Sequence, residues 1–176
     1  LGISVSLLAI LYRESHPNVV ELGHLPGTRS FKDVERFKEA KPLERILILR
    51  IDASFSFTNA EYFKDFILNK CKDCKEPLEA VIIDGSTVND LDSTALESLK
   101  IVIKTLAEWK IEFYLTGLKG PVRDILKKDG LYQKLDKERI YRNPHQAISG
   151  ILKKWDKRKK SENRYEEYFK RTKDSN

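Results

Sequence analysis

Segments with the apolar pattern of β-strands alternate along this chain with segments that have the apolar spacing of α-helices. This alternation predicts the secondary structure. The longest apolar runs resemble buried strands and occupy residues 45–51, 78–84 and 110–115. The first of them is nearly continuously apolar, which indicates a strand covered on both faces. Weaker strand patterns cover residues 16–23 and 140–141, and residues 31–41 fit a strand or a loop equally well.

Apolar residues at helical spacing fill the segments between these runs. Leu99, Val102 and Leu106 share one face of a predicted amphipathic helix that ends near Trp109. Other helices are predicted to begin at Thr58 or Asn59, to run from Pro121 to Lys128 with Gly130 as the stop, and to run from Pro144 through Trp155. This alternation predicts an α/β fold, in which a mostly parallel β-sheet of about four to five strands is flanked by about four to five α-helices.

The segment from residue 84 to residue 95 holds the best candidate site. It leaves a predicted strand and leads into a predicted helix, the usual position of a site in an α/β sheet. Five polar residues make it a candidate phospho-acceptor or ligand loop with a regulatory role: Asp84, Ser86, Asp92, Ser93 and Thr94.

Two interpretations of Asp92, Ser93 and Thr94 compete. The first is helix capping alone, because Thr94 and Glu97 match a capping box, as do residues 58–61. The second is a phospho-acceptor or an anion contact, because a helix N-terminus favours a negative group. Asp92 would repel that group, which favours a switch over a permanent anion site. Capping is the more frequent role for such residues.

Positive charge is concentrated at the C-terminus. Ten of the 33 Lys and Arg residues, but only five of the 27 Asp and Glu residues, fall within residues 153–176. The rest of the chain is nearly neutral, so no nucleic-acid partner is expected. Residues 157–176 are predicted to form a basic, flexible tail. Four of them could face anionic lipid, with solvation alone as the equal alternative: Lys157, Arg158, Lys159 and Lys160.

Common enzyme motifs are absent from the sequence. It contains neither a Gly-x-Ser-x-Gly elbow nor a glycine-rich phosphate loop, so no enzymatic activity and no cofactor are predicted. Asp84, Asp90 and Asp92 could hold Mg²⁺ for phosphoryl chemistry, but a solvated loop is the favoured interpretation. Cys71 and Cys74 lack the second ligand pair of a structural zinc site, and we expect them to be reduced in a surface loop.

The first eleven residues form the most apolar stretch of the chain. They are too few to cross a bilayer, which needs about 20 residues. Residues 1–15 are either the end of a longer membrane helix with its linker or an edge element packed on the domain. Tyr12 and Arg13 resemble an interfacial flank and favour the first interpretation. The absence of an initiator Met suggests that the chain is a fragment of a longer protein.

Together these residues resemble a STAS domain, the family that includes anti-sigma-factor antagonists and the C-terminal part of SulP-type anion transporters. The most specific match is the strand–loop–helix pattern Val81-Ile-Ile-Asp84 followed by Leu91-Asp-Ser-Thr-Ala95, and the next is the segment from Gly117 to Leu131. Pro17-Asn-Val-Val-Glu-Leu-Gly23 and Leu49-Arg-Ile-Asp52 point to the transporter branch.

The transporter resemblance implies a STAS domain over residues 16–156, at the cytoplasmic face of the cell membrane within a multi-pass membrane protein. The domain would be non-catalytic and would regulate or assemble a transporter of sulfate-like inorganic anions. Its implied partner is the transmembrane domain of the same polypeptide. Further candidate partners are a second copy of the chain, a cytosolic regulatory protein and a nucleotide.

The antagonist resemblance implies a different role, that of a stand-alone phospho-switch binding protein. In that branch the pattern is Asp-Ser-Ser-Gly, and the second Ser accepts phosphate from a partner kinase. The matching position here is Thr94, followed by Ala95 in place of the Gly. The methyl group of Ala95 lies where a partner backbone would approach closely, which is a departure from the pattern.

Overall fold

One mixed sheet organises the computed structural model, which describes residues 6–7, 12 and 15–173, with the side chains of 137 and 160–173 excepted. Its spatial order is β2 (Phe31–Asp33), β1 (Val19–His24), β3 (Ile46–Ile51), β4 (Ala80–Asp84), β5 (Glu112–Thr116) and β6 (Ile140–Tyr141). The strands from β3 to β6 are parallel, whereas β1 is antiparallel to both β2 and β3. The predicted α/β fold is confirmed, and the segment that the pattern left undecided contributes β2.

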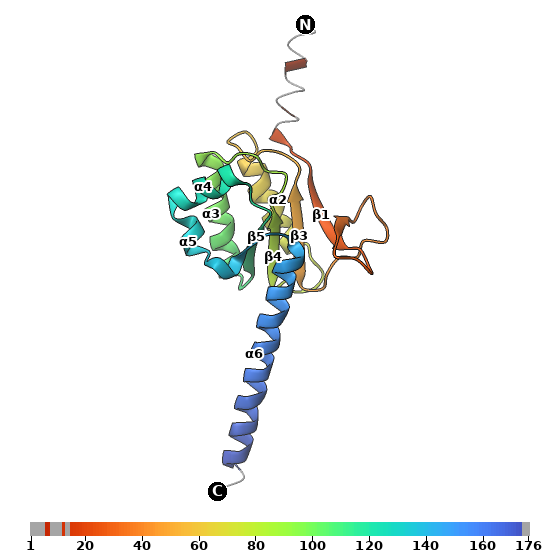
Figure 1. Cartoon of the computed structure of the whole chain (residues 1–176), viewed down its shortest axis with the longest axis vertical. Coiled ribbons are helices and arrows are strands. Elements are labelled where there is room, and N and C mark those ends of the chain that lie inside the picture. The colour runs from red at the N-terminus through yellow and green to blue at the C-terminus, as the bar shows by residue number, and fades with distance from the viewer. Residues whose placement is uncertain (1–5, 8–11, 13–14, 174–176) are drawn as a thin grey trace.

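Helices cover both faces of the sheet (Figure 1). On one face lie α2 (Ala60–Lys72), α3 (Ser93–Glu108), α4 (Gly120–Asp129) and the short α5 (Leu131–Lys134), which leads into the 3-10 helix η1 (Lys137–Arg139). The other face is covered by the start of α6 (Pro144–Lys173). Helix α6 then continues beyond the sheet, so the segment predicted as a tail is helical as far as Lys173.

Alternating side chains of β3 enter two separate cores. Leu47 and Leu49 pack under α2 and α3, whereas Ile46 and Ile48 pack toward α6. All four are nearly or fully buried, which confirms that this strand is covered on both faces. The two-sided burial explains why the strand reads as a continuous apolar run.

The structure agrees with the predicted end of one helix but not with the predicted start of another. The end of α4 is as predicted, because Gly130 adopts a left-handed conformation (φ +84°) that other residues rarely take. The capping box expected at residues 58–61 is wrong. Asn59 precedes α2 but gives the helix no side-chain cap, since its amide bonds back to Ser56 and Ser54 in the preceding loop. The polar loop competes successfully for this side chain.

Helix α6 is anchored by a few fully buried residues, and we predict that its attachment is sensitive to Ile151. Ile151→Ala should lower the free energy of unfolding by about 2–5 kcal/mol, because a buried aliphatic side chain is replaced by a cavity. The adjacent Leu152 is 52% exposed, so Leu152→Ala should change it by less than about 0.5 kcal/mol. Equal losses for the two variants in urea denaturation would show that α6 is not packed this way.

Candidate functional site

Three loops meet at the edge of the sheet where β3, β4 and β5 end, which we call the carboxyl edge. Residues 52–59 and 85–92 run side by side there, since the Phe55 amide donates to the Asp90 carbonyl at 3.2 Å and the Asp92 amide to the Phe55 carbonyl at 3.4 Å. The third loop begins at Gly117 and is tied in where the Gly85 amide donates to the Thr116 carbonyl at 2.8 Å. The predicted site residues therefore lie in a hydrogen-bonded group of loops.

Asp84 fixes the base of this group. Its carboxylate is buried and accepts hydrogen bonds from the Ser86 amide at 3.2 Å, the Ser86 hydroxyl at 3.1 Å and the Thr116 hydroxyl at 3.4 Å. Gly117 (φ +68°) makes room for it, because a Cβ at that position would lie 2.8 Å from Asp84 Oδ1. Asp84 and Ser86 therefore hold two strand ends together and present little free chemistry.

Asp92 joins the first loop to α3. One carboxylate oxygen accepts from the Ala95 amide at 2.9 Å, and the other accepts from the Phe57 amide at 2.6 Å. Asp92 is therefore the N-cap of α3, and the capping box predicted for Thr94 and Glu97 is wrong. The Asp92 carboxylate accepts the otherwise unpaired Ala95 amide. The observed cap therefore lies two residues before Thr94, the cap that the sequence predicted.

Ser93 and Thr94 project from the first turn of α3. Both are exposed, and within the described residues neither hydroxyl makes a hydrogen bond. Beside them is Phe57, whose backbone is held by Asp92 while its side chain is 71% exposed. We call Phe57, Ser93 and Thr94 the contact surface. The sequence did not identify Phe57 as a candidate, because the hydrophobic pattern does not show whether a single aromatic side chain is exposed.

Asp84 and Asp92, two of the three residues considered for Mg²⁺, act as hydrogen-bond acceptors. The oxygens of Asp84 and Asp92 are occupied by the hydrogen bonds above. No group of three or more potential His, Cys, Asp or Glu ligands occurs in the described part of the chain. The Mg²⁺ hypothesis therefore lacks a ligand set at Asp84, Asp90 and Asp92.

Cys71 differs from expectation in its position, whereas Cys74 lies in the loop that follows α2, as predicted. Cys71 lies inside α2 and is buried, rather than in a surface loop, and Cys74 donates to the Lys70 carbonyl at 3.3 Å. Burial, reinforced by the nearby Cys74, raises the pKa of the Cys71 thiol to about 12. At neutral pH this thiol is protonated and a poor nucleophile.

A small hollow adjoins Asp84 and Ser86 on the α6 side of the sheet. It has a volume of about 220 Å³, and Arg29, Arg50 and His145 contribute to its walls. Arg50 is already paired with Asp52, at 2.6 and 3.0 Å. The hollow is smaller than the roughly 300–1,000 Å³ typical of ligand pockets, so it does not suit a nucleotide.

The predicted lipid-facing cations lie far from these loops. Helix α6 runs from the carboxyl edge toward the opposite, amino edge, where Trp155 lies under Arg45 and Lys154 pairs with Glu112 at the start of β5. Lys157, Arg158 and Lys159 follow there and are exposed, while the side chain of Lys160 lies outside the described residues. The structure therefore separates the two groups of predicted site residues.

Most of the predicted membrane segment, residues 1–15, lies outside the described residues. In the part of the chain that is described, no helix combines the length and apolar character that a bilayer crossing requires.

The fold and the carboxyl edge together define a class of domain. A mixed sheet covered on both faces presents a helix N-terminus with two exposed hydroxyls on a hydrogen-bonded group of loops. The model of the STAS domain family matches residues 38–147, and the chain belongs to this family.

Similar proteins include transporters and an anti-sigma factor antagonist. Sulfate transporter 4.1, chloroplastic, of Arabidopsis thaliana is 27% identical over 164 residues, which cover 86% of this chain and 24% of that protein. The murine Slc26a9 anion transporter in its inward-facing state has a similar fold, with a TM-score of 0.73, 16% identity and coverage of 84% of this chain and 24% of its own. An anti-sigma factor antagonist from Mycobacterium paratuberculosis matches at a TM-score of 0.54 and 17% identity, covering 64% and 90%. The chain thus spans about a quarter of the length of the curated transporters that it matches.

The corrected cap leads to a stability prediction. Asp92→Ala should lower the free energy of unfolding by about 1–3 kcal/mol, because the Ala95 and Phe57 amides both lose their acceptor. Thr94→Ala, two residues away, should change it by less than about 0.5 kcal/mol. Thermal and urea denaturation of both variants would measure this difference. A larger loss of unfolding free energy for Thr94→Ala would contradict Asp92 as the cap and support the predicted capping box.

Proposed function

We propose that this chain is the cytoplasmic STAS domain of a SulP-type inorganic anion transporter, in which it has a non-catalytic regulatory or assembly role. The alignment with sulfate transporters over most of the chain is the observation that carries this proposal. The contact surface agrees with a binding role, since its hydroxyls are exposed but the surrounding carboxylates serve as structural acceptors.

The position at which the chain enters the sheet indicates which side of the domain would face the membrane part. The chain enters the sheet at Asn18, whose carbonyl accepts from the Asp52 amide at 2.9 Å just beyond the end of β3. Val19 is paired with Ile51, so a segment that precedes residue 16 reaches the domain at the carboxyl edge. In a transporter whose membrane part precedes this domain, the contact surface would lie on the side of the domain that is nearest to that part.

Regulation would then act through packing at this edge. A phosphate on Ser93 or Thr94 would add negative charge at an exposed helix start, next to the charge of Asp92. A membrane domain packed against Phe57 would sense that change as a gain or loss of contact. The transported anion is a property of the membrane part, and sulfate is the substrate that the names of the relatives suggest.

Photo-crosslinking in membranes tests this arrangement. A photoreactive residue at position 57 of the complete natural polypeptide should form crosslinks to segments that precede residue 1, as identified by peptide mass spectrometry. Trp109 is the matched control, because it is an aromatic residue with 37% exposure at the other end of α3. The same probe at position 109 should give no such crosslinks.

The opposite pattern, or crosslinks from position 57 only to a second copy of the domain, would contradict the proposed packing. In the second case the contact surface would be a dimer interface.

A second candidate function is a phospho-switch of the antagonist type with Thr94 as the acceptor. The exposure of the Thr94 hydroxyl favours it, and the similarity in fold to an anti-sigma factor antagonist agrees with it. Mass spectrometry of the protein from its own cells should then find phosphate on Thr94 under at least one growth condition. Its absence from Ser93 and Thr94 under all conditions would leave these residues with only a structural or contact role.

A further inference from the structure

The segment that leads into β1 is attached to α2 by aromatic rings. The ring of His16 stacks on that of Tyr12, with centroids 4.3 Å apart and planes inclined by 23°. It also contacts the ring of Tyr62 on α2, at 4.9 Å and 60°. Tyr62 in turn lies 6.1 Å from Phe66, one turn further along that helix. These separations are typical of aromatic pairs, so four rings form a continuous series of contacts from the entering segment onto α2.

Hydrogen bonds fix the geometry of His16 within this series. Its amide donates to the Tyr12 carbonyl at 3.1 Å, which closes one helical turn, and its Nδ1 lies 3.0 Å from the same oxygen. The next residue, Pro17, is buried. Because a residue before proline is driven from the helical into an extended conformation, the turn ends at His16 and the chain enters β1 directly. The chain therefore changes direction at a defined point.

Helix α2 also contacts the loop that carries Phe57 of the contact surface. Phe63, which follows Tyr62 in the helix and is 1% exposed, packs edge-on against Phe55 of that loop, with centroids 4.5 Å apart. The Phe55 amide in turn bonds to the neighbouring loop at the carboxyl edge. Two consecutive residues of α2 thus connect the entering segment to the base of the contact surface.

The helix between these two contacts is firmly packed. Its inner side holds four buried residues: Ala60, Phe63, Ile67 and Cys71. Close-packed interiors deform little, so a displacement at one side of such a helix moves the helix as a unit. The orientation of the entering segment and the position of the loop at residue 57 are therefore linked through α2.

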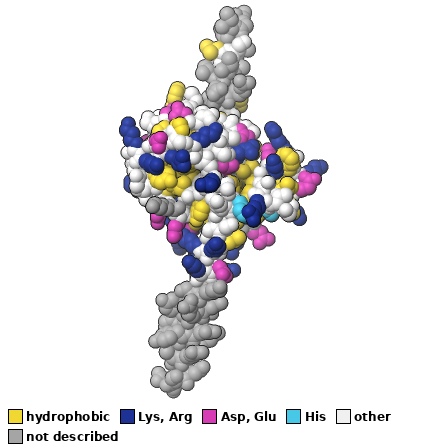
Figure 2. Space-filling view, in the orientation of Figure 1, with side chains coloured by type: hydrophobic (Ala, Val, Ile, Leu, Met, Phe, Trp, Pro, Cys, Tyr) yellow, Lys and Arg dark blue, Asp and Glu magenta, His cyan; other side chains and the backbone are white. Residues whose placement is uncertain are grey.

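Charge offers no comparable explanation for the attachment of the entering segment. In the space-filling view, Lys and Arg side chains are interspersed with Asp and Glu over the visible face of the body (Figure 2). An area of one sign that would draw the segment to that face is not seen there. We therefore attribute the attachment to the ring contacts and hydrogen bonds of His16.

We propose that Tyr12, His16 and Tyr62 form an entry joint, which fixes the direction in which the chain reaches the domain. They are positioning residues, because they act through α2 on a loop that they do not touch. In the proposed transporter, the joint would hold Phe57 at a constant place relative to the membrane part, and this consequence rests on the proposed function. The joint itself is a property of the 176-residue chain.

NMR relaxation of the 176-residue chain tests the joint. The His16 amide should have an order parameter above about 0.8, as rigid backbone does. Tyr62→Leu removes the ring but keeps an apolar side chain, and it should lower this order parameter below about 0.6, the range of flexible backbone. Tyr62→Phe retains the ring and should retain the order parameter of the unaltered chain.

A second variant tests the joint from the entering segment. Tyr12 is 67% exposed, so Tyr12→Leu removes the stacked ring without disturbing the core. It should also lower the order parameter of His16. This variant decides the question if Tyr62→Leu does not fold.

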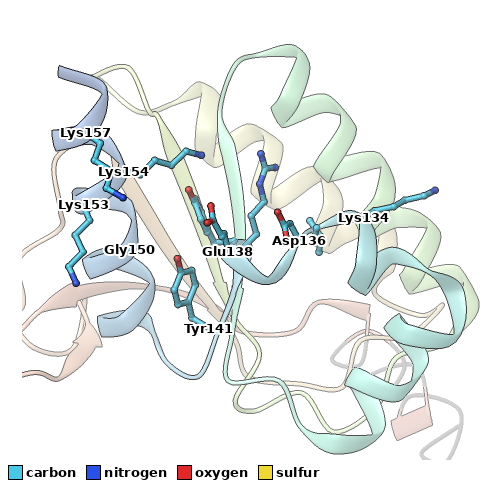
Figure 3. Close-up of a pocket in the computed structure, with 11 residues that line it drawn as sticks. Lys134, Asp136, Glu138, Tyr141, Gly150, Lys153, Lys154 and Lys157 are labelled. Atoms are coloured by element: carbon cyan, nitrogen blue, oxygen red, sulfur yellow. The ribbon is translucent and has the colours of Figure 1, made fainter. Parts of the chain in front are cut away.

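Tyr132→Leu is the matched control. Tyr132 is also a half-buried tyrosine, but it lies on α5, and its replacement should leave the order parameter of His16 unchanged. Residues 134–136 report on the integrity of Tyr62→Leu. They line one wall of the cleft in Figure 3, with Lys153 and Lys157 of α6 on the opposite wall, and this cleft shares no residue with the entry joint. Their amide resonances should stay in place, whereas a general loss of structure would move them.

Three results would overturn the entry joint. The first is an order parameter below about 0.6 at His16 in the unaltered chain. The second is an order parameter that neither Tyr62→Leu nor Tyr12→Leu lowers. The third is an equal loss in Tyr132→Leu, which would show that the effect is not specific to the rings of the joint.

Crosslinking in membranes separates this inference from the proposed function. In the complete natural polypeptide, the photoreactive residue at position 57 is combined with Tyr62→Leu or with Tyr62→Phe. Crosslinks to segments that precede residue 1 should fall at least about threefold in Tyr62→Leu, because a flexible connection lowers the effective concentration of the contact surface at the membrane part. They should not fall in Tyr62→Phe.

The outcomes of the two experiments are distinguishable. Crosslinks that persist unchanged in Tyr62→Leu would overturn the positioning role and leave the proposed function intact. If no variant forms crosslinks, but His16 is ordered and is released by Tyr62→Leu, the entry joint is supported and the proposed packing against the membrane part is contradicted.

Discussion

Burial of the central strands on both faces is the constraint from which the rest of this structure follows. Because Ile46 and Ile48 leave β3 on the face opposite to Leu47 and Leu49, a layer of helices on one side could not remove all four from water. Helix α6 supplies the second cover with Ala147 and Ile151. Its direction across the sheet then carries the basic residues that follow to the amino edge.

The two edges of the sheet consequently have different chemistry. At the carboxyl edge, buried or shared carboxylates hold the loops together, and an aromatic ring and two hydroxyls project from a rigid base. At the amino edge, lysines on α6 face the segment between α5 and β6 across an open cleft.

The sequence predicted elements that depend on neighbouring residues, and it failed where distant ones compete. The apolar run of β3, Pro121 at the start of α4 and Gly130 at its end are local signals, and the structure agrees with them. The two capping boxes failed because Asn59 bonds within the preceding loop and Asp92 takes the amides of Phe57 and Ala95.

We propose that this STAS domain is part of a membrane transporter, and an immunoblot of fractionated cells would test that proposal. An antibody raised against the domain would be applied to soluble and membrane fractions of cells that produce the natural protein. A band much heavier than 20.5 kDa is expected in the membrane fraction. A soluble band near 20.5 kDa would contradict the transporter assignment and make the antagonist-type switch at Thr94 the better explanation.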